Sequence, residues 1–227
     1  MAFLEFNQVS FSYPQEGRFA LRDIQLGFSR DGITAITGAN GSGKTTLTKL
    51  MIGVLRSTRG TVCLEGRSLE EYSLGEIGRR IGYVFQNPDL QFFCSTVAEE
   101  ISFGFVNQGC RPETVEEKIQ YYLDYFELGN YRHVFPLHLS HGEKRRLAIA
   151  SVLATEPSFL ILDEPTTGLD AYRKRLLADL LIKIAGAGIG ISLVSHDQAF
   201  VNRLAERVIT LEKGRVVWDS GEGRKHG

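Results

Sequence analysis

Cysteine is scarce in this chain, and positive charge is not in excess. The three cysteines, Cys63, Cys94 and Cys110, are scattered and show no Cys-x-x-Cys spacing, which argues against a cysteine metal site or a redox motif. Such usage fits a reducing compartment. The formal net charge is −1, so no overall positive field is available to hold a polyanion, and we expect no nucleic-acid partner. Any phosphate group must therefore be recognised by a few residues at one site, without help from the overall charge of the protein.

The chain also lacks a long uninterrupted apolar run and a secretory signal. Residues 1–11 carry Glu5 and no basic residue, unlike the positively charged start of a signal peptide, and they are predicted to form a strand. The most apolar stretch, 176–195, is interrupted by Asp179 and Lys183 and divided by glycines. It is predicted to be a helix followed by a buried strand, so a partner would have to hold the protein at a membrane.

Strands alternate with helices along the chain. Strands are predicted at 3–11, 32–38, 60–64, 81–85, 159–162, 190–194, 207–211 and 215–218. Helices are predicted at 44–55, 115–126 and 170–184. This alternation predicts an α/β fold with a parallel-sheet core, and the tail 221–227 is expected to be disordered.

A glycine-rich motif lies between the predicted strand 32–38 and the predicted helix 44–55. It fits the pattern G-x-x-x-x-G-K-[ST] with Gly38-Ala39-Asn40-Gly41-Ser42-Gly43-Lys44-Thr45. Glycines let successive backbone N–H groups point at phosphate oxygens, and the helix that follows adds the positive end of its dipole. We expect Lys44 to contact the β- and γ-phosphates and Thr45 to place its hydroxyl on Mg²⁺. The alternative, a glycine-rich turn without a ligand, does not explain the flanking strand and helix.

Two adjacent carboxylates, Asp163 and Glu164, end the apolar strand 159–162. Core strands usually avoid ionised groups because these are costly to bury unpaired. The carboxyl edge of a parallel sheet is where ligands bind, so we expect Asp163 to reach Mg²⁺ and Glu164 to orient and deprotonate the attacking water. Either carboxylate alone could be a helix cap.

With these motifs in this order, the chain resembles the ATP-binding-cassette (ABC) ATPases over nearly its whole length. The resemblance implies one domain spanning 1–227, with a P-loop α/β core, an antiparallel β region near the N-terminus and a helical subdomain inserted at roughly 87–151. It implies hydrolysis of ATP to ADP and phosphate with ATP and Mg²⁺ as cofactors.

Further residues take their roles from this family. Tyr13 matches the aromatic residue that stacks on adenine, Gln86 the glutamine that touches Mg²⁺ and water, and His196 the histidine that contacts the γ-phosphate. The resemblance thus implies catalytic roles for Glu164, His196 and Gln86, and metal contacts for Thr45, Gln86 and Asp163. The residues that it assigns to ATP binding are Tyr13, Gly38, Ala39, Asn40, Gly41, Ser42, Gly43, Lys44, Thr45, Thr46, Ser140, Gly142, Glu143 and Asp170.

The segment Leu139-Ser140-His141-Gly142-Glu143 resembles the family signature Leu-Ser-Gly-Gly-Gln, with His141 and Glu143 as departures. In the family, the signature opens a helix whose N-terminus meets the ATP bound on the opposite subunit. The resemblance therefore implies a head-to-tail dimer, either a homodimer or a heterodimer with another ABC ATPase. The basic cluster Lys144-Arg145-Arg146 falls in this helix and is interpreted as a solvated face or a dimer contact.

The segment Gln86-Asn87-Pro88-Asp89-Leu90-Gln91 resembles an element of the energy-coupling-factor ATPases. This resemblance implies an importer of a vitamin or a transition-metal ion, in which the ATPase sits at the cytoplasmic face of the cell membrane. Its partners would be a transmembrane coupling protein, with an arginine facing Asp89, and a substrate-binding membrane protein. Two alternatives stay open: a soluble ABC ATPase without a transport role, and the catalytically weak half of a heterodimer, which the altered signature would suit.

Overall fold

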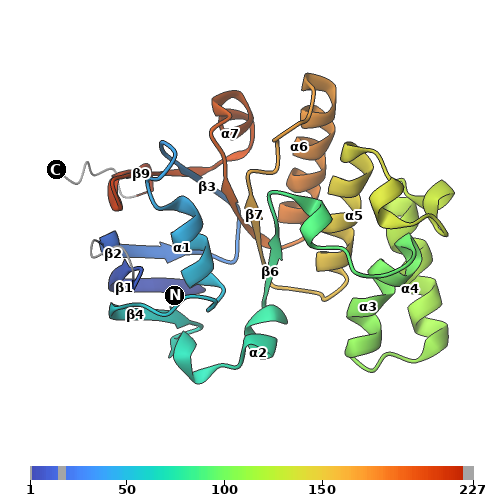
Figure 1. Ribbon diagram of the computed structural model, residues 1–227, viewed down its shortest axis with the longest axis horizontal. Coiled ribbons are helices and arrows are strands. Elements are labelled where there is room, and N and C mark those ends of the chain that lie inside the picture. The colour runs from blue at the N-terminus through green and yellow to red at the C-terminus, as the bar shows by residue number, and fades with distance from the viewer. Residues whose placement is uncertain (1, 15–18, 222–227) are drawn as a thin grey trace.

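The computed structural model describes residues 2–14 and 19–221, which form two β-sheets with helices around them (Figure 1). Apart from Gly221, the tail that is predicted to be disordered lies outside the described residues. Figure 1 shows the helices α3 (Val97–Asn107), α4 (Pro112–Tyr125) and α5 (His141–Leu153) at one end of the molecule. The strands β1 (Leu4–Ser12), β2 (Phe19–Phe28) and β4 (Arg59–Leu64) lie at the other end. Helices α1 (Lys44–Met51), α2 (Leu74–Gly78), α6 (Ala171–Gly186) and α7 (Gln198–Leu204) lie between these ends.

The larger sheet has six strands in the order β10-β9-β3-β8-β7-β6. Neighbouring strands from β9 to β6 run parallel, and β10 pairs antiparallel with β9. The strands are β3 (Ile33–Thr37), β6 (Ile81–Val84), β7 (Phe159–Asp163), β8 (Gly190–Val194), β9 (Arg207–Glu212) and β10 (Arg215–Asp219). The predicted parallel-sheet core is confirmed.

The smaller sheet is antiparallel, in the order β2-β1-β4-β5. Its strands are β1 (Leu4–Ser12), β2 (Phe19–Phe28), β4 (Arg59–Leu64) and β5 (Arg67–Ser68). Strand β2 is absent from the sequence prediction, because Arg22 and Asp23 break its apolar alternation and the pairing with β1 is irregular. Asp23 adopts a left-handed backbone, with φ of 49°, within this strand.

Helix α1 (Lys44–Met51) starts at the glycine-rich motif and is shorter than predicted, because Gly53 takes a positive φ just after it. The other helices are α2 (Leu74–Gly78), α3 (Val97–Asn107), α4 (Pro112–Tyr125), α5 (His141–Leu153), α6 (Ala171–Gly186) and α7 (Gln198–Leu204). Short 3₁₀ helices form at Leu69–Glu71, Pro88–Leu90, Gly129–Tyr131 and Pro136–His138. None of the helices in the described part of the chain has the length and apolar character needed to cross a bilayer.

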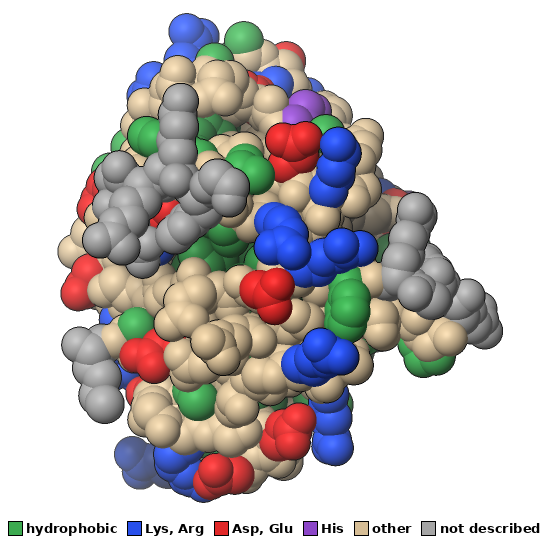
Figure 2. Space-filling view, turned by 90° about the vertical axis from the view of Figure 1, so that its left-hand side faces the viewer, with side chains coloured by type: hydrophobic (Ala, Val, Ile, Leu, Met, Phe, Trp, Pro, Cys, Tyr) green, Lys and Arg blue, Asp and Glu red, His purple; other side chains and the backbone are tan. Residues whose placement is uncertain are grey.

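Apolar side chains form two cores. One lies between the larger sheet and helices α3, α4, α5, α6 and α7, and the other lies around α1 between the two sheets. Because β7 is buried along its whole length, its last residues are held rigidly where the sheet meets solvent. The end of the molecule that carries the small sheet shows Lys and Arg side chains with Asp and Glu side chains among them (Figure 2).

Candidate functional site

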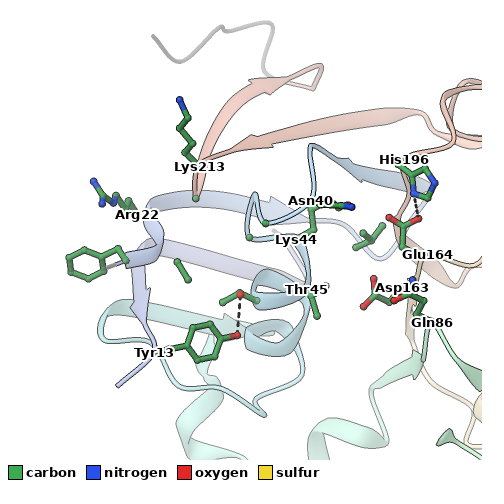
Figure 3. A pocket seen from close by; sticks show the side chains of 17 residues that line it. Tyr13, Arg22, Asn40, Lys44, Thr45, Gln86, Asp163, Glu164, His196 and Lys213 are labelled. Carbon is green, nitrogen blue, oxygen red and sulfur yellow. Dashed lines mark hydrogen bonds and ion pairs between the residues drawn. The ribbon is translucent and has the colours of Figure 1, made fainter. Parts of the chain in front are cut away.

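The carboxyl ends of four neighbouring parallel strands bring the predicted catalytic residues together. The glycine-rich loop follows β3, His196 follows β8, Asp163 and Glu164 end β7, and Gln86 follows β6. They meet at a cavity of about 820 Å³, shown in Figure 3. The residues that line it are Tyr13, Phe19, Ala20, Arg22, Asn40, Gly41, Gly43, Lys44, Thr45, Thr46, Gln86, Asp163, Glu164, Val194, His196, Lys213 and Gly214.

The glycine-rich loop needs glycine at two positions for steric reasons. Gly38 has a φ of 140°, and a Cβ atom there would lie 2.2 Å from the carbonyl oxygen of Leu211. Gly43 caps α1 with a φ of 106°, and a Cβ there would lie 2.7 Å from Leu21. Only a residue without a side chain fits both places. The loop can therefore pass closely over the sheet and turn directly into the helix.

The Lys44 side chain lies across this loop. Its Nζ donates hydrogen bonds to the carbonyl oxygens of Gly38, at 2.8 Å, and Ala39, at 3.0 Å. Thr45, the next residue, is exposed at the cavity. The loop thus keeps a fixed shape through its own lysine, with the ammonium at the place where the motif predicts phosphate.

Asp163 is buried at the cavity wall and has a fixed orientation. The Tyr83 hydroxyl donates to Asp163 Oδ2 at 3.1 Å and also contacts the Thr48 hydroxyl at 3.3 Å. Burial raises the pKa of Asp163, and the hydrogen bond from Tyr83 works against that rise. The sequence gives no sign of this role for Tyr83, which reads only as one more residue of a strand.

Glu164 and His196 are paired within the cavity. Their contact, from His196 Nδ1 to Glu164 Oε2, is 2.8 Å, and the dashed line in Figure 3 marks it. The Glu164 side chain is 10% exposed and that of His196 is 68% exposed. Glu164 has a left-handed backbone, with φ of 45°, and its N–H donates to the carbonyl of Val194 at 2.9 Å. This unusual backbone turns the carboxylate toward the end of the neighbouring strand.

Tyr13 reaches the other end of the cavity. Its hydroxyl lies 3.2 Å from that of Thr46, and its ring packs edge-on against Phe11. Phe19, Arg22 and Lys213 also line this end, and none of them was found by sequence reasoning. Single basic residues on a strand or a turn carry no recognisable pattern. Stacking of Tyr13 on adenine stays a prediction.

The signature residues and Asp170 do not line this cavity. Ser140 caps α5, where its hydroxyl accepts a hydrogen bond from the N–H of Glu143 and Glu143 Oε2 accepts one from the N–H of Ser140 at 2.7 Å. Burial favours the neutral acid, but hydrogen bonds from Tyr131 and Ser140 lower the pKa of Glu143. Asp170 likewise caps α6 by accepting from the N–H of Arg173 at 2.8 Å. Gly142 is buried close to Arg173.

His141 and Glu143, the two residues that differ from the family signature, both make hydrogen bonds within this chain. Glu143 completes the capping box of α5, as a glutamine would. The His141 ring contacts the loop after Glu164, with Nε2 2.9 Å from the carbonyl oxygen of Thr167. His141 also lies against Gly168, where a Cβ atom would come within 3.0 Å of its ring.

Arg145, in the basic cluster after the signature, is buried, so the interpretation as a solvated face is wrong for this residue. Arg145 is 1% exposed, and its guanidinium donates to the carbonyl oxygens of Phe85 and Gln86. Lys144 forms an ion pair of 2.9 Å with Asp89. The pattern of three basic residues could not show this, because the acceptors are main-chain atoms of a segment about 60 residues earlier.

The segment 86–91 is attached to α5 by several side chains. Besides the Lys144–Asp89 pair, Gln91 Nε2 donates to the carbonyl of Ala148 at 2.8 Å. Leu90, between Asp89 and Gln91, is left 76% exposed. Asp89 therefore has a partner within its own chain, and contact with an arginine of a membrane protein stays a prediction.

Known proteins resemble this chain over most of its length. Residues 21–167 match the ABC transporter family. A Pyrococcus horikoshii protein, PH0132, carries the provisional name ABC transporter ATP-binding protein. It is 42% identical to this chain over 213 residues, which are 94% of this chain and 81% of that protein. The energy-coupling factor transporter ATP-binding protein EcfA of Methanothermobacter thermautotrophicus is 39% identical over 217 residues, which are 94% of this chain and 69% of that protein.

Among solved structures, cbiO1 from Clostridium perfringens, described as part of the ABC transporter complex cbiONQ, has a TM-score of 0.89 at 32% identity. The alignment covers 96% of this chain and 88% of that one. The P-loop fold expected from the sequence is confirmed by this likeness. The family match and these relatives agree with the arrangement of the cavity: this chain belongs to the ABC transporter ATP-binding proteins, which are ATPases.

Proposed function

We propose that this chain is the ATP-hydrolysing subunit of an energy-coupling-factor importer for a vitamin or a transition-metal ion. The observation that carries its ATPase role is the meeting of Lys44, Gln86, Asp163, Glu164 and His196 at one cavity. The similarity to EcfA and to cbiO1 supports the importer type. In this proposal the chain is one domain with a helical subdomain at about 87–151, and it works at the cytoplasmic face of the membrane.

In the proposed reaction, ATP binds with its phosphates over the glycine-rich loop. Lys44 offsets the charge of the β- and γ-phosphates, and backbone N–H groups of the loop and of the first turn of α1 donate to their oxygens. Tyr13 lies far enough along the cavity to meet the base end of the nucleotide, where Arg22 and Lys213 also lie (Figure 3). The long axis of the cavity thus matches a nucleotide with its phosphates toward Glu164.

Glu164 acts as the general base in this proposal. Its carboxylate accepts the proton of the attacking water, and His196 orients the carboxylate through the contact at Oε2. The other carboxylate oxygen, Oε1, makes no side-chain hydrogen bond within the part of the chain that the structure describes, so it can accept one from the water. Because His196 is exposed, its second ring nitrogen can reach a phosphate oxygen at the mouth of the cavity.

The residues at the cavity fit Mg²⁺ as a second cofactor. The described residues include no group of His, Cys, Asp and Glu that could hold a metal by itself. Thr45, Gln86 and Asp163 offer oxygen atoms, which is the donor set for a Mg²⁺ ion that takes its remaining ligands from phosphate and water. Bound there, Mg²⁺ would neutralise charge on the transferred phosphoryl group.

A dimer would place the signature at a second nucleotide site. Ser140, Gly142 and Glu143 do not line the cavity of their own chain, so a role in ATP binding requires a second subunit. The N-terminus of α5 offers N–H groups and a positive dipole end for the γ-phosphate bound by that subunit. Asp170, at the start of α6, belongs to the same proposed dimer contact. Both a homodimer and a heterodimer satisfy this arrangement.

The proposed docking site for the transmembrane coupling protein is the apolar surface beside the segment 86–91. Leu90, Phe93, Phe103 and Val106 are all exposed there, and the rings of Phe93 and Phe103 lie 4.6 Å apart. A groove of about 350 Å³ next to them continues between α2 and α3. Large exposed apolar residues that cluster in this way mark protein contacts, and a helix of the membrane partner would fill the groove.

Changing Leu90 tests this docking site. In Leu90→Asp, the charge would have to be buried against an apolar partner, so we expect co-purification of the transmembrane protein to fall by at least about 10-fold. The measurement is the yield of the membrane partners purified with the tagged chain from native membranes. Identification of the smallest co-purified membrane protein would give the transported substrate.

The control is Ile182→Asp, which places the same charge on α6, at a residue that is 46% exposed and lies outside the groove. It should co-purify its partners normally, and both variants should hydrolyse ATP at the normal rate as isolated proteins. Normal assembly of Leu90→Asp would contradict the proposed surface. If the unmodified tagged chain co-purifies with no membrane protein, the alternative of an ABC ATPase without a transport role is favoured.

A further inference from the structure

One buried charge on α5 has no part in the reaction described so far. Arg145 is among the most deeply buried large side chains of the protein, at 1% exposed. It makes no ion pair with any carboxylate that the structure describes, and its Nε has no hydrogen-bond partner there. Burial lowers the pKa of Arg145 to about 10. A charge in such a place is costly, so a methionine or leucine would fill the same space at lower cost.

The guanidinium is used to hold the main chain of two consecutive residues. Nη1 donates to the carbonyl oxygen of Phe85 at 2.8 Å, and Nη2 donates to that of Gln86 at 2.9 Å. Two parallel donors in a rigid fork fix both the position and the direction of the segment, which a lysine ammonium cannot do. Gln86 itself lines the nucleotide cavity. The place of a cavity residue is thus set from α5.

Helix α5 also contacts the segment that follows Glu164, a second residue of the cavity wall. His141, its first residue, contacts the carbonyl oxygen of Thr167, and the N–H of Thr167 donates to the carbonyl of Glu164 at 3.2 Å. A continuous path of hydrogen bonds therefore runs from Gln86 through Arg145, along α5 and through His141 to the segment that begins with Glu164. Helix α5, which begins after Ser140 and contains Gly142, thus connects the segment of Gln86 with the segment of Glu164.

We propose that Arg145 is a positioning residue for ATP hydrolysis, which fixes Gln86 relative to Glu164 through α5. This inference rests on the proposed role of Gln86 in the reaction. It assigns Arg145 no contact with ATP. Binding of nucleotide, which depends on the glycine-rich loop, should not depend on Arg145, whereas the rate of the bound complex should.

A double-mutant cycle with Gln86 tests the inference. Arg145→Lys keeps the charge and loses the fork, so we expect kcat to fall by about 10- to 100-fold, as displacement of a reacting group by about 1 Å can cause. ADP affinity should stay unchanged. In a Gln86→Ala background the side chain that Arg145 positions is gone, and Arg145→Lys should then change kcat by less than about 2-fold. Equal effects of Arg145→Lys in both backgrounds would overturn the inference, as would a normal kcat for Arg145→Lys alone.

The same double-mutant cycle distinguishes a wrong catalytic role for Gln86 from a wrong positioning role for Arg145. If Gln86→Ala alone leaves kcat unchanged, the catalytic role of Gln86 is wrong. If Gln86→Ala lowers kcat and Arg145→Lys does not, only the role of Arg145 is wrong. The four proteins are compared per folded molecule, by counting the sites that bind ADP.

Two further variants separate positioning from stability. Arg145→Met removes the buried charge and keeps the volume, so its melting temperature should be equal or higher while its kcat falls at least as far as that of Arg145→Lys. If Arg145→Lys folds poorly, Arg145→Met takes its place in the double-mutant cycle with Gln86→Ala. A purely structural role predicts the opposite, a lower melting temperature with normal kcat per folded molecule. Lys144→Ala, which breaks the neighbouring pair with Asp89, is the matched control and should leave kcat of the isolated protein unchanged.

Discussion

Lys44→Ala is expected to weaken ATP binding by about 100-fold or more, since loss of a hydrogen-bonded charge at a binding site typically costs several kcal/mol. The substitution removes the ammonium that lies across the glycine-rich loop, and with it the two hydrogen bonds to Gly38 and Ala39 that hold the loop in shape. Both losses act in the same direction. Isothermal titration with ATP, on protein shown to be folded by circular dichroism, measures the change.

The matched control is Lys49→Ala, on the same helix α1 but outside the cavity lining. It removes the same charge and should keep ATP affinity within a few-fold of normal. If the two variants lose affinity equally, the general charge of α1 matters and not the position of Lys44. Unchanged affinity in folded Lys44→Ala would show that nucleotide binds elsewhere.

Glu164→Gln should retain ATP binding and lose turnover by about 10²- to 10⁴-fold, the usual contribution of a general base. The amide has the shape of the carboxylate and can still accept a hydrogen bond from His196, so the geometry of the cavity is kept. It cannot take a proton from water at neutral pH. Hydrolysis therefore stops after binding, and a long-lived ATP-bound dimer should accumulate, which size-exclusion chromatography with multi-angle light scattering would detect.

Glu156→Gln is a close chemical match for this experiment. Glu156 also has a left-handed backbone, with φ of 52° against 45° for Glu164, and it pairs on the surface with Lys118 away from the cavity. The control should hydrolyse ATP normally and form no lasting dimer. Near-normal hydrolysis by Glu164→Gln would mean that another group takes the proton. Asp163, buried and held by Tyr83, would then be the next residue to change.

The part of the site that local motifs encode could be predicted from the sequence. The glycine-rich loop and the strand ending in Asp163 and Glu164 are contiguous patterns, and the parallel sheet brings their ends together as alternating strands and helices predict. The order of the remaining motifs along the chain predicted that Gln86 and His196 belong to the same site. The structure places both residues at this cavity.

The features that were missed depend on contacts between distant segments. Strand β2 is irregular at Asp23, so its alternation is hidden, and only pairing with β1 reveals it. Arg145 looks like one of three surface charges until the carbonyls of Phe85 and Gln86 are seen beside it. Tyr83 becomes informative only because Thr48 and Asp163 lie next to its hydroxyl. Periodicity within a helix or strand describes that element alone and does not report such partners.

The left-handed backbone at Glu164 has a consequence for how this protein would respond to selection in the laboratory. A residue with a side chain costs about 1 kcal/mol in that conformation, and glycine avoids the cost. Glu164→Gly would relieve the strain and remove the buried carboxylate at once, so it should melt at a higher temperature while losing its activity. A screen for heat resistance alone would therefore enrich inactive proteins at this position, and thermostable variants of this ATPase have to be selected for turnover at the same time.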